Sequence, residues 1–128
     1  MIDFEHVTKI YKRSDTPALE DIDFHVDDGE FVFLVGPSGS GKTTLMKLIT
    51  GEIRATEGNV IVNDFDMMKI KRRKLPKMRR TLGVIFQDYR LIENMNVYDN
   101  VAFAMRVIGA REREIRDRVP YVLELVGL

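Results

Sequence analysis

The chain has 128 residues, of which 45% are hydrophobic, and its 20 basic residues balance its 20 acidic ones. This length suffices for one modest core and is too short for two ordinary domains, so we expect a single domain over residues 1–128. The absence of cysteine excludes a disulfide scaffold and thiolate catalysis. No apolar stretch approaches the roughly 20 residues of a membrane-spanning helix, and residues 1–5 lack the layout of a signal peptide, so we expect a cytoplasmic protein.

The first thirty residues predict two half-exposed strands. Alternation gives each strand one apolar face, formed by Ile2, Phe4 and His6 in the first and by Ile22, Phe24 and Val26 in the second. This period is typical of an antiparallel sheet with one face in water. His6 and His25 have no paired ligand nearby in the sequence, so we interpret both as structural.

Residues 36–43 read Gly-Pro-Ser-Gly-Ser-Gly-Lys-Thr, a complete G-x-x-x-x-G-K-[ST] phosphate-binding loop. The loop follows the apolar run Phe31–Val35, which does not alternate and predicts a strand covered on both faces. A helix is predicted to begin at Lys42. Backbone N–H groups of such a loop converge on phosphates, and the helix N-terminus adds a favourable dipole. The motif therefore predicts a nucleoside triphosphate as ligand.

Each residue type in the loop has a chemical reason to be there. Lys42 can reach the outer phosphates, and the Thr43 hydroxyl can ligate Mg²⁺. Valine at Gly41 is expected to force a side chain into the space of the β-phosphate. Chance alone gives the four fixed positions in about one chain in 250 of this length, which disfavours an ordinary Gly/Ser turn. The predicted nucleotide-binding residues here are Gly36, Pro37, Ser38, Gly39, Ser40, Gly41, Lys42, Thr43 and Thr44.

Five further elements follow the loop helix, which we expect to end at Gly51. Asn59–Val62 predicts a short strand with a turn at residues 63–64, and Leu82–Phe86 predicts a second fully apolar strand. Two helices are expected at residues 97–108 and 111–126, and Pro120 is expected to restart or kink the second. The first of them carries one apolar stripe, composed of Val97, Val101, Ala104, Met105 and Ile108.

A short basic helix, interrupted by Pro76, is expected between those two strands. Leu75, Met78 and Leu82 are spaced to pack on one of its faces. The cations are Lys69, Lys71, Arg72, Arg73, Lys74, Lys77, Arg79 and Arg80. A solvated helix face, a surface near a membrane or membrane protein, and a nucleic-acid surface are the alternatives. The lack of interleaved Gly or aromatic residues disfavours nucleic acid.

The order of these pieces resembles the nucleotide-binding domain of an ABC ATPase. The resemblance rests on two antiparallel strands before the loop, on Tyr11 25 residues upstream of Gly36, and on Gln87 at the end of an apolar strand. Residues 31–39, 84–91 and 100–109 resemble the bacterial ATP-binding subunits of cell division, with subunits of lipoprotein-release or macrolide-export type as the alternative. The resemblance implies an α/β P-loop NTPase fold, an ABC ATPase core with an N-terminal antiparallel β subdomain, truncated at the start of the helical subdomain.

The resemblance also implies roles and partners. Tyr11 would stack on adenine, Gln87 would ligate Mg²⁺ beside the attacking water, and Lys42 and Gln87 would be the catalytic residues present. The implied cofactors are ATP and Mg²⁺. The implied partners are an integral membrane protein, contacted through Gln87–Tyr98, and a second copy of the chain in a head-to-tail dimer that encloses ATP. The protein would then lie at the cytoplasmic face of the cell membrane, without direct contact to nucleic acid.

Three family features are absent from these 128 residues: the signature segment, the strand ending in Asp-Glu and the switch histidine. We therefore expect the N-terminal portion of a nucleotide-binding domain, which alone does not hydrolyse ATP. A small P-loop kinase is the alternative from another class. It is disfavoured because thirty residues precede the loop strand and no Gly/Arg-rich lid follows it.

Overall fold

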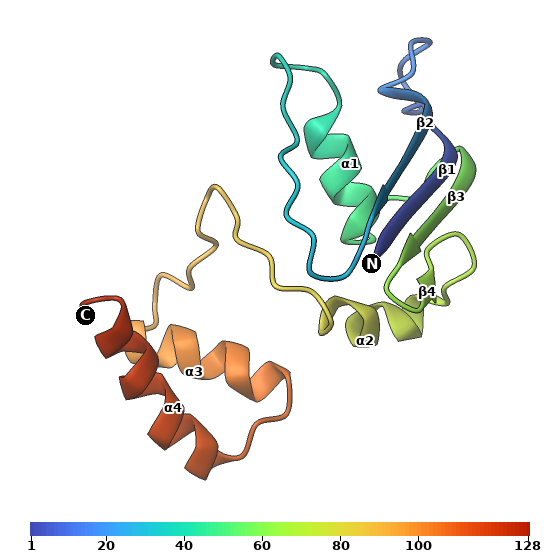
Figure 1. Cartoon of the computed structure of the whole chain (residues 1–128). Coiled ribbons are helices and arrows are strands. Elements are labelled where there is room, and N and C mark those ends of the chain that lie inside the picture. The colour runs from blue at the N-terminus through green and yellow to red at the C-terminus, as the bar shows by residue number, and fades with distance from the viewer. The chain divides into compact units, whose positions relative to one another are not determined.

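The computed structural model describes all 128 residues, which form two compact units at residues 1–83 and 84–128 (Figure 1). The first unit contains β1 (Ile2–Lys9), β2 (Leu19–Val26), α1 (Lys42–Ile49), β3 (Glu57–Val62), β4 (Phe65–Asp66), the 3₁₀ helix η1 (Arg72–Lys74) and α2 (Leu75–Arg79). The second contains α3 (Val97–Val107) and α4 (Glu112–Leu125). None of these helices has both the length and the apolar character that crossing a bilayer requires.

The four strands form one antiparallel sheet in the order β2-β1-β3-β4. Phe4 in β1 lies opposite Phe24 in β2 and Val60 in β3, and the two phenylalanine rings stack with their centroids 4.5 Å apart. Paired apolar side chains of this kind are the main source of sheet stability. The structure confirms the two strands predicted in the first thirty residues, which are β1 and β2. It also confirms the strand predicted at Asn59–Val62 and the turn after it.

The alternation changes phase within β1, contrary to the sequence prediction. Phe4 and Val7 are both buried, whereas His6 is exposed and has a φ of 49°. The register shifts between Phe4 and Val7, as it does at a β-bulge, where an extra residue turns the following side chains to the other face. Gly58 permits this geometry, because a Cβ there would lie 2.2 Å from the His6 carbonyl oxygen.

Helix α1 covers one face of the sheet and closes the core of the first unit (Figure 1). Its residues Leu45, Leu48 and Ile49 are buried in the same cluster as Phe4 and Val60. The last residue of the helix is Ile49, Thr50 is its C-cap, and Gly51 follows in the left-handed conformation, so the predicted end at Gly51 is confirmed. The position of the helix start, and thus of the phosphate loop, is set by this packing.

The basic segment also packs as its apolar spacing predicts. Met78 is fully buried, and Leu75 and Leu82 pack against the same core. Pro76 stands in the first turn of α2 and does not interrupt a helix. Proline is tolerated there because the first N–H groups of a helix have no intrahelical acceptor.

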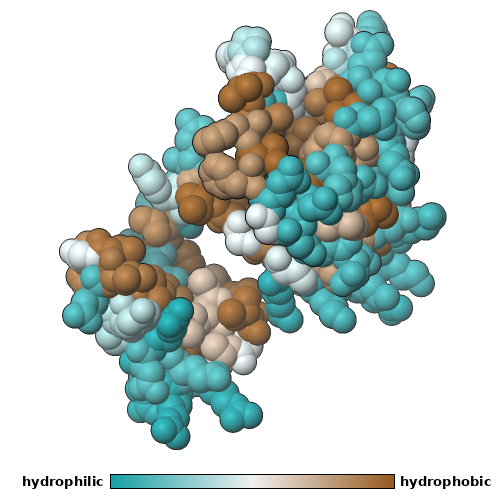
Figure 2. All heavy atoms as spheres, viewed as in Figure 1, coloured by the Kyte–Doolittle hydropathy of each residue, from teal (hydrophilic) through white to brown (hydrophobic).

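The two fully apolar runs are not strands, so those predictions are wrong. Neither residues 31–35 nor residues 82–86 belong to the sheet, and the side chains of Phe31 and Ile85 are 81% and 100% exposed. In Figure 2, hydrophobic spheres lie on the surface along the stretch that precedes α1. A strand that is apolar on both faces requires hydrogen-bonded neighbours and covering layers, and no other strand of this sheet pairs with either run.

In the second unit, α3 packs against α4 through a small core. Ala102, Ile115 and Val119 are fully buried there, and Tyr98, Val101 and Met105 pack against them. The stripe predicted for α3 is therefore only partly right, since Val97, Ala104 and Ile108 are exposed. The small Ala102 side chain lets the helices approach closely, which places this residue at the centre of the contact.

Helix α4 runs through Pro120 as one element, so the predicted restart is wrong. Its buried residues lie on the N-terminal side of Pro120, and Leu123 on the other side packs against the same cluster. This packing offsets the loss of one helical hydrogen bond. The helix begins where the Arg111 backbone N–H donates to the Glu114 carboxylate at 2.7 Å.

Candidate nucleotide-binding site

The phosphate loop leads directly into α1, with Gly41 as the last residue before the helix. Gly41 has a φ of 89°, a left-handed conformation that favours glycine. A Cβ at Gly41 would lie 2.5 Å from the Ala18 carbonyl oxygen and 2.7 Å from Leu19 Cδ2. A larger residue would therefore collide with the protein itself. This clash is a second reason for glycine at position 41, beside the collision with the β-phosphate that the sequence predicts and that stays a prediction.

Lys42 folds back over the loop and bonds to the loop's own oxygens. Its Nζ donates to the carbonyl oxygens of Gly36 and Pro37, both at 2.7 Å, and to Ser40 Oγ at 3.2 Å. No carboxylate lies within salt-bridge distance of this ammonium. The loop thus holds a positive charge that no carboxylate of the chain neutralises. The ammonium is hydrogen-bonded only to three oxygen atoms of the loop. An anionic ligand could compete for the same N–H donors.

The first turn of α1 is suited to an anion and to a hard cation beside it. The helix has no acidic residue in its first turn, and no side chain caps its N-terminus. The backbone N–H groups there are consequently free to meet a phosphate. Thr43 is exposed, and its hydroxyl is an oxygen ligand of the kind that Mg²⁺ prefers. These residues fit the predicted nucleotide and metal.

Tyr11 lies at the same end of α1 as the phosphate loop. Its hydroxyl is 3.2 Å from Thr44 Oγ1, and Lys9 Nζ lies 5.5 Å from the centre of its ring. Thr44 is buried, so its side chain serves as a support for Tyr11, a role that the sequence alone did not suggest. Tyr11 is 37% exposed, which leaves it accessible to a base. The structure therefore brings the predicted adenine-stacking residue and the loop together.

Gln87 lies in the second unit, so its place beside the phosphate loop stays a prediction. Within that unit it is exposed, in a turn that the Tyr89 N–H closes by donating to the Phe86 carbonyl at 3.3 Å. The Arg90 guanidinium stacks over the Phe86 ring at 3.8 Å from its centre. Because Gln87 is exposed, its side-chain amide is accessible to a ligand.

Asn100 braces the loop that follows Gln87, a role with no signal in the sequence. The Asn100 side-chain oxygen accepts from the Ile92 N–H at 2.8 Å. Its amide nitrogen donates to the carbonyl oxygens of Ile92, Met95 and Asn96 at 3.0–3.2 Å. A side chain that satisfies four backbone groups holds residues 92–96 against the start of α3.

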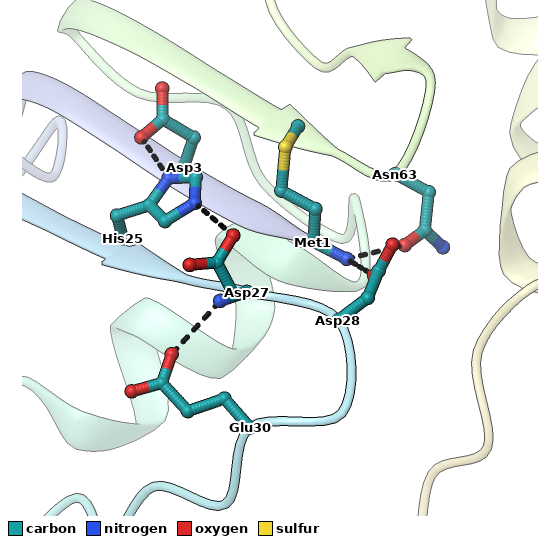
Figure 3. Close-up of polar contacts among 7 residues, drawn as sticks. All are labelled: Met1, Asp3, His25, Asp27, Asp28, Glu30 and Asn63. Carbon is teal, nitrogen blue, oxygen red and sulfur yellow. Dashed lines mark hydrogen bonds and ion pairs between the residues drawn. The ribbon is translucent and has the colours of Figure 1, made fainter.

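The two histidines have carboxylate partners that the sequence did not reveal. Sheet pairing brings Asp21 and Asp23 to 2.9 Å and 3.4 Å from His6 Nδ1. Figure 3 shows His25 between Asp3 at 2.9 Å and Asp27 at 3.1 Å. In the same view the Met1 amino group bonds to Asp28 and Asn63. All these groups are partly or fully exposed. The histidine pairs join β1 to β2 and to the residues just after it, and the Met1 amino group joins the segments that follow β2 and β3.

These pairs predict that stability decreases with rising pH near neutrality. The Asp21 hydrogen bond raises the pKa of His6 above its usual 6.5, and the Asp3 hydrogen bond raises the pKa of His25 in the same direction. A raised pKa means that the folded chain binds the proton more tightly. The stabilisation is therefore complete below pH 6.5 and is lost as the pH rises through the folded-state pKa values.

The test is urea unfolding of wild type and the double variant His6→Gln/His25→Gln between about pH 5.5 and pH 8. The wild type should lose unfolding free energy across this range, and the variant should lose less. Equal slopes for the two proteins would show that these pairs do not contribute.

The comparisons with known proteins address the same features. The sequence profile described as "ABC transporter" matches residues 19–128. The cell division ATP-binding protein FtsE of Mycobacterium tuberculosis is 53% identical over all 128 residues, which cover 56% of that protein. FtsE of Escherichia coli K12 is 44% identical over the whole chain, which covers 57% of it. The chain belongs to the ABC transporter family.

Solved structures of ABC cassettes share the fold of this family member. The dimeric post-hydrolysis state of the ATP-binding cassette MJ0796 bound to ADP and Pi superimposes with a TM-score of 0.87 at 30% identity, with 100% of this chain and 58% of that one covered. The structure of cbiO1 from Clostridium perfringens, part of the ABC transporter complex cbiONQ, gives a TM-score of 0.83 at 28% identity, with 99% of this chain and 50% of that one covered. These findings confirm the predicted family and fold class. The ABC-family chain spans a little over half the length of its FtsE relatives.

Proposed function

We propose that this chain is the nucleotide-binding part of an FtsE-type ATPase, which binds ATP with Mg²⁺ and couples its hydrolysis to an integral membrane protein. The sequence resemblance suggests FtsX as that partner and cell division as the process. The FtsE relatives at 43–53% identity over the whole chain support this assignment. The dimeric cassettes among the structural neighbours support a head-to-tail dimer of the full protein around ATP.

One observation carries the nucleotide part of the proposal. The Lys42 ammonium has three oxygen acceptors in the loop and no carboxylate partner, beside an uncapped helix N-terminus. Tyr11 is held at the same end of α1 by Thr44. A cation, free N–H groups and an accessible aromatic ring are the complementary groups for a triphosphate and a base.

The proposed division of labour among these residues follows from their chemistry. Lys42 and the loop N–H groups bind and orient the phosphates, and the ring of Tyr11 orients the base. A bound Mg²⁺ would supply charge neutralisation of the phosphates, with Thr43 and Gln87 as its protein ligands. No residue of the 128 takes the position of a general base for water in this scheme, so hydrolysis is assigned to the full-length protein.

An assay of phosphate release tests this assignment of nucleotide binding to these residues and of hydrolysis to the full-length protein. The protein expressed at the full length of its gene should hydrolyse ATP in a Mg²⁺-dependent way, and Lys42→Ala should abolish turnover. The variant Lys47→Ala, on the same helix and without an ion-pair partner, should retain it. The 128-residue chain alone should release no phosphate above background, because removing groups that act in the transition state costs orders of magnitude in rate. Turnover by the 128-residue chain that Lys42→Ala abolishes would contradict this.

The contact with the membrane partner is assigned to the segment Gln87–Tyr98. Tyr89 and Leu91 are 81% and 67% exposed, and polar residues flank them. Leu91 and Met95 also line an open, mostly apolar hollow of about 610 Å³, whose other walls are Ile92, Glu93 and residues of α3, α4 and the chain after α4. Exposed apolar side chains of this kind commonly mark a protein contact. The occupant we propose is a cytoplasmic helix of the membrane partner.

The double variant Leu91→Ser/Met95→Ser tests the docking surface in the full-length protein. Copurification with the membrane partner should be lost, while ATP binding and the melting temperature remain close to wild type. The matched control is Phe103→Ser/Val107→Ser, which removes two exposed apolar side chains of α3 that do not line the hollow. A drop of several degrees in melting temperature together with lost partner binding would instead identify Leu91 and Met95 as core residues.

A further inference from the structure

The segment 71–80 has the highest density of positive charge in the chain. It contains seven cations and no acidic residue, in η1, α2 and the residue on either side of them. All seven side chains are exposed, and only Met78 of this segment is fully buried. The seven cations are Lys71, Arg72, Arg73, Lys74, Lys77, Arg79 and Arg80. We call this set the basic surface.

The chain does not neutralise the basic surface. None of its seven side chains forms a salt bridge, and the nearest ion pair joins Lys69 to Asp66 just upstream. Arg79 alone has partners, since it donates to the backbone oxygens of Thr50 at 2.9 Å and Gly51 at 3.2 Å. Uncompensated charges of one sign on one surface produce a local positive potential, even though the net charge of the chain is zero.

Two open hollows flank this segment, and cations line both. One, of about 490 Å³, has three cations and one carboxylate in its wall: Arg54, Arg72 and Arg79 with Glu52. The other, of about 310 Å³, has four cations and two carboxylates in its wall: Lys69, Lys71, Arg73 and Lys74 with Asp64 and Asp66. Hollows of this size lined by Arg and Lys fit phosphate groups. Figure 2 shows hydrophilic spheres over the region where Figure 1 places α2.

We propose that the basic surface is a contact site for an anionic lipid bilayer and that its two hollows receive phosphate-bearing headgroups. This goes beyond the proposed function, which requires only a protein partner at the membrane. A bilayer fits better than a nucleic acid for two reasons. The segment 71–80 contains no aromatic residue on which a base could stack, and α2, with five residues fixed on the core by Met78, is too short to enter a groove.

The expected strength follows from the number of cations. Each Lys or Arg near an anionic membrane surface increases partitioning by roughly fivefold at low salt. Long side chains on a short, anchored helix can reach headgroups at different depths without deforming the core. Added salt should weaken the contact. At 0.1 M ionic strength the Debye length is about 10 Å, and the attraction between exposed charges farther apart than this is largely screened.

Vesicle cosedimentation of the full-length protein tests the proposal. Vesicles of phosphatidylcholine are compared with vesicles that contain about 30% phosphatidylglycerol. The variant Lys71→Gln/Arg73→Gln/Lys74→Gln/Lys77→Gln removes four charges from the basic surface. The control Lys12→Gln/Arg13→Gln/Arg113→Gln/Arg116→Gln removes four exposed charges elsewhere.

We expect the wild type to bind only the anionic vesicles, the variant to bind them at least tenfold more weakly, and the control to change by less than about threefold. Equal loss in variant and control would overturn the proposal. So would binding of the wild type to a nucleic-acid duplex, and not to vesicles, at the same salt. ATP binding is measured on the same variant, and because Lys42 is unaltered it should be unchanged. A failure of lipid binding is thereby distinguished from a failure of the proposed function.

Discussion

Replacing Lys42 by alanine is expected to weaken ATP binding by tenfold to a hundredfold. The structure gives the reason, since the Lys42 ammonium is the one cation inside the loop and no carboxylate neutralises it. A charge-assisted hydrogen bond to phosphate contributes about 1.5–3 kcal/mol, which corresponds to this range in affinity. The measurement is an equilibrium titration with a fluorescent ATP analogue.

Lys47→Ala is the matched control, because Lys47 lies in the last turn of the same helix and its side chain has no bonded partner. It should bind the analogue as the wild type does. If Lys42→Ala bound the ATP analogue with unchanged affinity, the assignment of the loop as the phosphate site would be wrong. Equal weakening in both variants would point instead to a general effect of helix charge.

Replacing Gly41 by valine is expected to lower the free energy of unfolding more than Lys42→Ala does. The left-handed φ of 89° is strained for a β-branched residue, and the new Cβ would meet the Ala18 carbonyl oxygen at 2.5 Å. Backbone strain of this kind costs about 1–3 kcal/mol, and the clash adds to it. The free energy of unfolding without nucleotide should therefore fall by about 2–4 kcal/mol.

Gly29→Val separates the clash from the strain. Gly29 has a similar φ of 80°, but a Cβ there would meet nothing within 4 Å. Urea unfolding should show a larger loss for Gly41→Val than for Gly29→Val. If instead Gly41→Val kept its stability and lost only ATP binding, the collision would be with the phosphate, as the sequence alone suggested, and our structural reason would be wrong.

The features that the sequence predicts correctly are those determined by residues close to one another in the chain. The helix after the loop, its end at Gly51 and the β1–β2 pairing follow from local spacing, and all three are confirmed. The phosphate loop is identified by its glycines and Lys42 alone. These features need only neighbours that are close in the sequence, so a single chain is enough to find them.

What the sequence missed depends on contacts between distant segments. The exposed runs at residues 31–35 and 82–86 have the composition of buried strands, but composition cannot show whether a neighbouring strand is present to pair with them. The phase change at His6 depends on the close approach of Gly58 from another strand. In the candidate site, the hydrogen bond between Tyr11 and Thr44 joins residues 33 positions apart in the sequence. No periodic pattern in the sequence indicates that contact.

The central claim is that the chain of this ABC-family protein binds a nucleoside triphosphate at the Lys42 loop, and calorimetric titration of the full-length protein with MgATP tests it most directly. The account predicts saturable binding of one nucleotide per chain, competition by ADP, and loss of most of the affinity in Lys42→Ala. A wild-type protein that melts cooperatively, and is therefore folded, yet shows no saturable heat of binding with MgATP would contradict it.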